Sequence, residues 1–232
     1  EAEDGVRLLG GWQAQAGTVT VDGVAHVIYE APYTPSATPA NPSPSPTTLQ
    51  VYVPSVITPG LLITSGESAD TQSGTAGDDE YRGNGGDDTF DAGAGNDSLD
   101  AGTGDDSIIA GTGNDTVVAG TGADTVLAGA GNDSVDAGDG DDSIVGAEGA
   151  DTILGGLGDD TIQAGSDDDS VEAGAGADSI DGESGNDTLI AGAGNDTVVG
   201  GSGDDSVDAG SGDDLVFADA GADTLDGGVG ID

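Results

Sequence analysis

A nine-residue repeat fills the chain from Gly74 to Asp232 without an insertion or deletion, and it limits the possible folds more than any other feature. Residues 92–100 read AGAGNDSLD and residues 101–109 read AGTGDDSII. The frame gives seventeen complete copies and one partial copy, residues 227–232. A glycine-rich, acidic chain would otherwise suggest disorder. Because an apolar residue returns at every ninth place, we expect an array of repeated units that pack on one another.

Four of the nine repeat positions are nearly constant. Position six is Asp in all eighteen copies, position four is Gly in seventeen, position two is Gly in thirteen, and position eight is apolar in all seventeen complete copies. Glycine permits positive φ and therefore tight turns. The polar–apolar–polar order of positions seven to nine predicts a three-residue strand with one buried side chain. Two copies then form one coil of 18 residues, and coils stacked about 4.8 Å apart form parallel sheets.

The charge of the chain calls for a cation. There are 46 acidic residues against two basic ones, and the net charge is −44. Stacked coils place Asp above Asp, and unit charges about 5 Å apart repel by roughly 0.8 kcal/mol even in water. Carboxylates and backbone carbonyls are hard oxygen ligands, which favour calcium. The absence of Cys and the single His argue against zinc and copper.

The predicted metal ligands are the position-six aspartates. They are Asp79, Asp88, Asp97, Asp106, Asp115, Asp124, Asp133, Asp142, Asp151, Asp160, Asp169, Asp178, Asp187, Asp196, Asp205, Asp214, Asp223 and Asp232.

These repeats resemble the repeats-in-toxin (RTX) family, whose nonapeptide is GGxGxDxUx with U apolar. Residues 200–208, GGSGDDSVD, and residues 155–163, GGLGDDTIQ, match it throughout. The resemblance implies an all-β fold, a right-handed calcium-bound parallel β-roll. In the family each calcium lies between copies n and n+2, so eighteen copies give at most 18 − 2 = 16 sites. Sixteen calcium ions would reduce the net charge to about −12, and folding should be coupled to metal binding.

Some copies depart from the family pattern. Position one is Ala in eleven copies, where the resemblance requires only a backbone carbonyl as ligand. Position two is replaced at Ala147, Glu183 and Asp219, and position four at Asp167. We expect these four copies to have impaired calcium sites.

Residues 1–64 are predicted to form a separate small β-rich unit ahead of the β-roll, residues 74–232. Asp22-Gly23 between β-rich runs predicts a hairpin. Residues 31–48 contain six prolines and predict an extended loop, and two further strands are expected at 49–53 and 61–64. Residues 65–73 read as a degenerate lead-in copy, since Gln72 stands where the apolar residue should be.

Several functional classes are excluded by composition. Phosphate binding needs Lys and Arg, so we expect no nucleic-acid partner. The longest apolar runs fall far short of the roughly 18 residues of a membrane helix, so we expect no membrane insertion. The single histidine, His26, lies in a predicted strand, and nothing else indicates an active site. We therefore expect no enzyme.

The solvent-facing position nine differs between the two faces of the predicted roll. One face carries three consecutive apolar residues, Ile109, Leu127 and Val145, whereas the other face is mostly charged. These residues either reflect the β-branched composition of strands or form a lateral contact surface for a homo-oligomer. A roll that ends in an open sheet edge could also add further chains head to tail, as a filament.

The resemblance also implies export of the unfolded chain through a type I secretion system and folding in external calcium. We therefore expect a secreted, extracellular or cell-surface structural protein of bacteria, serving adhesion, spacing or filament assembly. The alternative is an RTX repeat domain excised from a larger secreted enzyme or toxin, where it would serve secretion and folding. Glu1 in place of Met is consistent with a processed or excised chain.

Overall fold

The computed structural model describes residues 18–21, 24–27 and 62–231, and all regular structure within them is β-strand. The chain divides into two compact units, Glu1–Ser45 and Pro46–Asp232. In the first, β1 (Thr18–Val21) and β2 (Val24–Val27) pair antiparallel across residues 22–23, which confirms the predicted hairpin. The proline-rich loop at 31–48 and the strand predicted at 49–53 lie outside the described residues. The described residues contain no helix that is long and apolar enough to cross a membrane.

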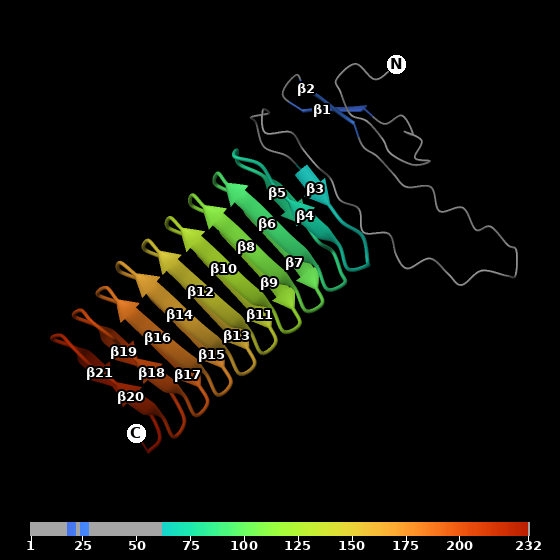
Figure 1. Ribbon diagram of the computed structural model, residues 1–232. Helices are drawn as coiled ribbons and strands as arrows, with labels where there is room; N and C mark the ends of the chain where they lie inside the picture. The colour runs from blue at the N-terminus through green and yellow to red at the C-terminus, as the bar shows by residue number, and fades with distance from the viewer. Residues whose placement is uncertain (1–17, 22–23, 28–61, 232) are drawn as a thin grey trace, which may run out of the picture. The chain divides into compact units, whose positions relative to one another are not determined.

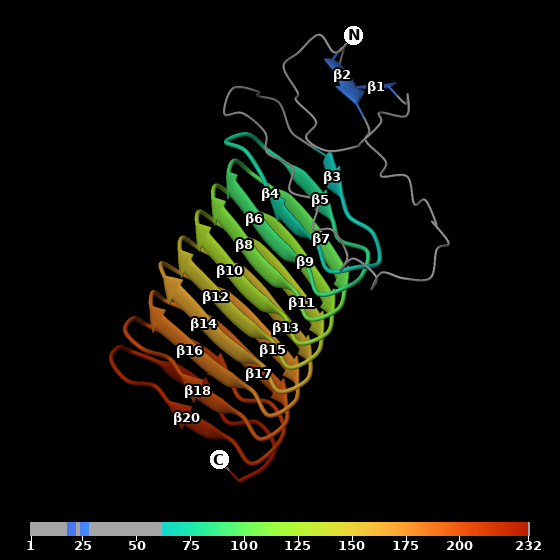
Figure 2. The same cartoon turned by 45° about the vertical axis from the view of Figure 1, so that its right-hand side comes forward.

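The second unit is a parallel β-solenoid, in which the chain alternates between two facing sheets (Figures 1 and 2). One sheet is made of β4 (Thr71–Ser73), β6 (Thr89–Ala94), β8 (Ser107–Thr112), β10 (Thr125–Ala130), β12 (Ser143–Glu148), β14 (Thr161–Ser166), β16 (Ser179–Ser184), β18 (Thr197–Val199) and β20 (Leu215–Phe217). The other sheet is made of β3 (Leu62–Thr64), β5 (Glu80–Arg82), β7 (Ser98–Thr103), β9 (Thr116–Thr121), β11 (Ser134–Asp139), β13 (Thr152–Leu157), β15 (Ser170–Ala175), β17 (Thr188–Ala193), β19 (Ser206–Asp208) and β21 (Thr224–Asp226).

The register confirms a coil of 18 residues. In the first of the two sheets Leu127 of β10 pairs with Ile109 of β8 on one side and with Val145 of β12 on the other. Each partner is 18 residues away, so equivalent repeat positions stack on one another along the whole solenoid. Two nonapeptides therefore make one coil, and every side-chain file in the structure is a file of one repeat position.

The strands in the middle of the solenoid are longer than the sequence predicted. β6 to β17 each have six residues and run from position seven to position three of the next copy, so the prediction of three-residue strands is wrong there. A six-residue strand turns two side chains inward instead of one. These are position eight and the following position one, as Ile108 and Ala110 show in β8.

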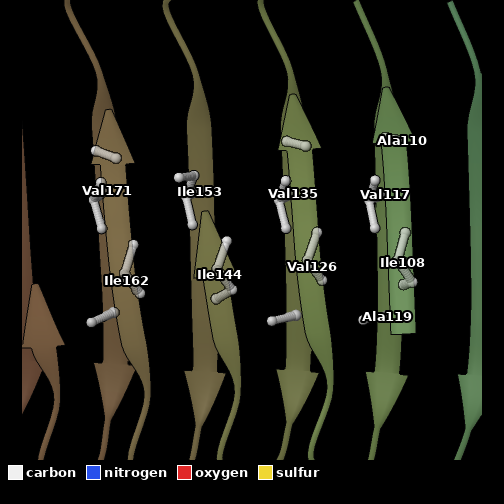
Figure 3. Close-up of a cluster of buried hydrophobic side chains, with 14 of the residues drawn as sticks. Ile108, Ala110, Val117, Ala119, Val126, Val135, Ile144, Ile153, Ile162 and Val171 are labelled. Carbon is white, nitrogen blue, oxygen red and sulfur yellow. The ribbon is translucent and has the colours of Figure 1, made fainter. Parts of the chain in front are cut away.

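The core consists of the position-eight and position-one side chains. Figure 3 shows Ile108, Val126 and Ile144 facing Val117, Val135 and Ile153 from the opposite sheet. Ten of the eleven position-one alanines are completely buried among them, and the exception is Ala218 near the C-terminal end. Alanine at position one is therefore a core residue, whereas the sequence comparison considered only its carbonyl group.

Glycine at positions two and four is required by both conformation and space. Gly111 and Gly113 have φ of 115° and 128°. A side-chain carbon on Gly113 would lie 1.7 Å from the carbonyl oxygen of Gly95 in the neighbouring coil. Five of the six non-glycine residues at these positions also adopt positive φ; they are Asn84, Ala147, Asp167, Glu183 and Asp219, and the exception is Thr75.

The solenoid begins earlier than the repeat pattern. Gln72 of β4 pairs with Phe90 of β6, so the degenerate copy at 65–73 forms part of a coil. Ile63 of β3 pairs with Tyr81 of β5. Residues 62–64, which the sequence analysis assigned to the end of the N-terminal unit, are thus stacked on the roll, because Ile63 supplies an apolar side chain above Tyr81.

Candidate metal-binding turns

The position-six aspartates form two buried files, one along each edge of the solenoid where the chain turns between the sheets. Sixteen of them, from Asp79 to Asp214, are only 1–5% exposed. Asp223 is half-buried, and Asp232 lies outside the described residues. Buried carboxylates are rare unless they are paired or bind a metal, so these two files are the main candidate for a functional site.

One oxygen of sixteen of these carboxylates, from Asp88 to Asp223, links neighbouring coils. The amide of Asp97 donates to Asp115 Oδ1 at 2.7 Å, and the amide of Asp115 donates to Asp133 Oδ1 at 2.8 Å. The main-chain carbonyl of Asp115 accepts from the Ser134 amide at 2.9 Å. These bonds fix each aspartate at the inside of its turn and direct its side chain toward the preceding coil.

The second oxygen, Oδ2, is the unusual feature. Fourteen Oδ2 atoms are buried and have no hydrogen-bond partner. An unpartnered buried polar atom costs roughly 1–3 kcal/mol, and more when the group is charged. The fourteen residues are Asp97, Asp106, Asp115, Asp124, Asp133, Asp142, Asp151, Asp160, Asp169, Asp178, Asp187, Asp196, Asp205 and Asp214.

Backbone carbonyl oxygens lie close to the Oδ2 atoms in the copies that have glycine at position one. The glycines at position one show how close these oxygens are. If Gly155 carried a side chain, its first carbon would lie 2.5 Å from both Asp160 Oδ2 and the Ala173 carbonyl oxygen. The same construction on Gly146 gives 2.5 Å to Asp151 Oδ2 and 2.3 Å to a carbonyl oxygen. A carboxylate oxygen and a carbonyl oxygen from the next coil therefore converge inside each of these turns.

Burial raises the pKa of thirteen position-six carboxyls, from Asp88 to Asp196. Desolvation is the main cause, and it raises the pKa of Asp124, Asp151 and Asp160 from 3.8 to about 7. The hydrogen bond to Oδ1 acts in the opposite direction, while neighbouring aspartates raise the pKa further. Without a cation these groups therefore tend to hold a proton near neutral pH.

The oxygen set fits a hard divalent cation. No three acidic, histidine or cysteine side chains converge on one point within residues 18–21, 24–27 and 62–231. A site in these turns would therefore combine position-six carboxylates with backbone carbonyls, and both are ligands that calcium accepts in flexible geometry. Fourteen of the position-six aspartates predicted from the sequence, from Asp97 to Asp214, thus lie in a suitable place, with unpartnered Oδ2 atoms that a cation would satisfy.

The irregular copies retain this arrangement. The copies that contain Ala147, Asp167 and Glu183 still bury their position-six aspartates at 1–3% exposure, and the Oδ2 atoms of these aspartates have no hydrogen-bond partner. The replacements act on the backbone instead, since each residue adopts a positive φ that favours glycine. The copy that contains Asp219 differs, because its Asp223 is only half-buried.

A second ladder on the outside of the turns was missed by the sequence analysis. Each Asn or Asp side chain at position five can accept a hydrogen bond from the position-five amide of the following coil. For instance, the Asn114 amide donates to Asn96 Oδ1 at 2.8 Å. This ladder runs toward the C-terminus, opposite to the position-six ladder. The ladder ends where position five is alanine. The amides of Ala123 and Ala150 still donate to the preceding coil, but their side chains have no acceptor for the next one. The only signal in the sequence is the frequency of Asn and Asp at position five.

The family comparison agrees with this geometry. The model of the RTX calcium-binding nonapeptide repeat matches residues 73–108, 100–135, 109–144, 136–171, 145–180, 163–198 and 199–232. These matches cover the whole of 73–232, well over half of the chain. The chain belongs to the RTX calcium-binding repeat family. A search of curated proteins found no match.

Proposed function

We propose that this chain is a secreted structural protein of the bacterial cell surface or extracellular matrix that folds when calcium binds between its coils. The observation that carries the proposal is the buried file of fourteen unpartnered Oδ2 atoms. RTX repeats bind calcium and are typical of secreted proteins, which supports an extracellular location. The role is structural, because the roll is a stack of uniform coils in which the acidic groups serve as ligands.

The proposed folding switch follows from charge. The net charge of −44 opposes compaction, and most position-six carboxylates are buried in the folded roll. Calcium would stabilise the folded state alone, since the ligands of one site come from successive coils and the unfolded chain does not hold them together. At low calcium the chain would remain unfolded and suitable for export. At high external calcium it would become a rigid spacer.

Circular dichroism tests this proposal. The purified chain in excess chelator should lack the β-signal, and calcium should restore it in a cooperative transition. Magnesium at the same concentration is the matched control and should be much less effective, because it tolerates the irregular, carbonyl-rich geometry poorly. A full β-signal in excess chelator at neutral pH would contradict the proposal.

The apolar stripe Ile109–Leu127–Val145 supports a lateral self-association. The three residues lie on adjacent strands, β8, β10 and β12. Ile109 and Leu127 are 42% and 39% exposed. Side chains at position seven of these strands are Ser or Thr, so the stripe is a neutral surface on a strongly acidic molecule. Two copies could meet there with less charge repulsion than on any acidic face.

Light scattering tests the stripe in the presence of calcium. Replacing Ile109, Leu127 and Val145 by Asp should reduce the mass to that of one chain. Val118→Asp on the opposite sheet is the matched control, because Val118 is 41% exposed and also occupies position nine. A mass unaffected by the three substitutions would remove the stripe from the proposal. Electron microscopy of the same samples would distinguish lateral pairs from the head-to-tail filament.

A further inference from the structure

Tyr81 is chemically different from the other residues of the core. It occupies position eight in β5, where every other complete copy has an aliphatic side chain or phenylalanine. Its ring packs edge-on against Phe90, with the ring centres 5.8 Å apart and an interplanar angle of 81°. The residue is completely buried, and its hydroxyl group has no hydrogen-bond partner.

The hydroxyl of Tyr81 points into the turn of its own copy. A side-chain carbon on Gly74 would lie 2.0 Å from the Tyr81 hydroxyl, 2.2 Å from the Ala92 carbonyl oxygen and 2.8 Å from Asp79 Oδ2. The hydroxyl therefore lies where the turns of other copies with glycine at position one, such as that of Gly155, bring together a carboxylate and a carbonyl oxygen. Only the missing side chain of Gly74 leaves room for it.

The next copy provides a comparison without the hydroxyl. A side-chain carbon on Gly83 would lie 2.0 Å from the Ala101 carbonyl oxygen and 2.8 Å from Asp88 Oδ2. The position-eight residue of that copy is Phe90, which has no oxygen. The two turns share the carboxylate and the carbonyl oxygen, whereas the phenolic oxygen is found only in the first.

The Tyr81 turn contains a further hydroxyl group. Both the amide and the hydroxyl of Thr75 donate to Asp79 Oδ2, at 2.7 Å and 3.0 Å. Thr75 occupies position two but does not adopt the positive φ found in the other copies. A carboxylate, a carbonyl and two hydroxyls therefore surround this turn, and all of them are hard oxygen groups.

We propose that the hydroxyl of Tyr81 is a ligand of the cation bound in the first turn of the roll, beside Asp79 and the Ala92 carbonyl. A hydroxyl oxygen has lone pairs to offer a cation, and a cation would satisfy the buried oxygen. The proposal rests on calcium binding by the repeats and adds a phenolic ligand that the nonapeptide pattern does not contain. It also makes Tyr81 a spectroscopic reporter for that one site.

Terbium(III) is a suitable probe, because it accepts the same oxygen ligands as calcium and emits when a nearby aromatic ring absorbs. The chain contains one Trp and four Tyr, so Trp12→Phe, Tyr29→Phe, Tyr33→Phe and Tyr52→Phe together leave Tyr81 as the only tyrosine. In this variant we expect terbium emission on tyrosine excitation, and calcium should displace it. Binding of either ion at neutral pH should also change the near-ultraviolet absorption of Tyr81, since the cation contacts the phenolic oxygen.

Two substitutions separate ligation from proximity. Gly74→Ala places a carbon against the hydroxyl and should reduce the tyrosine-excited emission several-fold. Gly83→Ala makes the same change one copy later and should leave the emission unchanged. If the two substitutions reduce the terbium emission equally, Tyr81 is not a ligand. The assignment is also overturned if the single-tyrosine variant folds and binds calcium but the absorption of Tyr81 does not change. If the unsubstituted chain does not fold with calcium, that result would instead contradict the proposed function itself.

Discussion

The fourteen position-six aspartates from Asp97 to Asp214 use their two oxygens differently. In Asp124, Oδ1 accepts the Asp106 amide at 2.7 Å, whereas Oδ2 is buried without a hydrogen-bond partner. Asparagine has nearly the same shape as aspartate. Its one oxygen can still accept the hydrogen bond, but it has no second oxygen to bind a cation. The link between coils and the metal ligand can therefore be separated by a single substitution.

Asp124→Asn should weaken calcium binding without abolishing the fold. Asn keeps the Oδ1 acceptor but replaces the ligand oxygen by a nitrogen with two donors. We expect the calcium midpoint of folding to rise by several-fold, up to about tenfold, which corresponds to about 1.4 kcal/mol. Asp105→Asn is the control, because Asp105 is an exposed position-five residue whose Oδ1 accepts the Ala123 amide. Equal shifts for the two variants in a calcium titration would argue against Oδ2 as ligand.

Ala147 stores strain in the backbone. Its φ is 90°, which costs an L-residue roughly 1–2 kcal/mol relative to glycine. Ala147→Gly should therefore raise the free energy of unfolding by up to about 1 kcal/mol, after the larger entropy of glycine in the unfolded chain is deducted. Ala110→Gly should lower it, because Ala110 is a buried core residue at a position that does not need positive φ. Urea titrations at fixed calcium would compare the two variants, and destabilisation by both would contradict this explanation.

At the scale of the strand, the sequence predicts the register but not the length. The constant spacing of Asp and of the apolar residue is enough to define an 18-residue coil, because equivalent residues must stack. Strand length depends on pairing with neighbours on both sides. β17 runs through Ala193, whereas β18 ends at Val199 although the same positions follow it. A local pattern that is nearly identical in both copies cannot predict this difference.

Inward-facing and outward-facing side chains of the same sheet should respond differently to truncation. Ile144 in β12 is 1% exposed, and Ile144→Ala should cost about 2–5 kcal/mol through lost burial and the cavity that it leaves. Ile109→Ala removes the same atoms from a side chain that is 42% exposed, and the monomer should lose far less. Chemical unfolding at low protein concentration and fixed calcium would measure both. Similar losses would mean that the solenoid core is not where the structure places it.

The position-six files could be predicted from the sequence, because Asp is constant and stands two residues before the apolar residue of every complete copy. The positive φ at Asn84, Asp167 and Asp219 followed from their glycine-like positions. The phenolic oxygen beside Gly74 could not be predicted. Its place depends on how far one ring reaches across the core, which is a property of packing and not of the repeat.

At the scale of the whole molecule, stability without metal should fall as the pH rises. Burial raises the pKa of Asp124, Asp151 and Asp160 from 3.8 to about 7, so the folded state binds more protons than the unfolded state between these values. The metal-free roll is therefore most stable below about pH 4 and loses that stability up to about pH 7. Thermal melts in excess chelator across this range would measure the trend. Stability that increases with pH in chelator would contradict it.

Calcium should reverse the dependence on pH. Protons and calcium compete for the same carboxylates, so the calcium concentration needed for folding should rise as the pH falls below about 6. The buried Asp97, Asp169 and Asp187, whose pKa is raised to about 6, would take part in this competition. A calcium midpoint that is independent of pH would indicate that the ligands lie elsewhere.

The most direct test of the central claim is the anomalous diffraction signal of calcium in crystals of the folded chain. We expect two files of peaks, one along each turn edge of the solenoid. Each peak should lie beside the Oδ2 atoms of position-six aspartates and the carbonyl oxygens that converge on them. Peaks found only at the exposed position-five carboxylates, or a folded roll without peaks in its turns, would contradict the account.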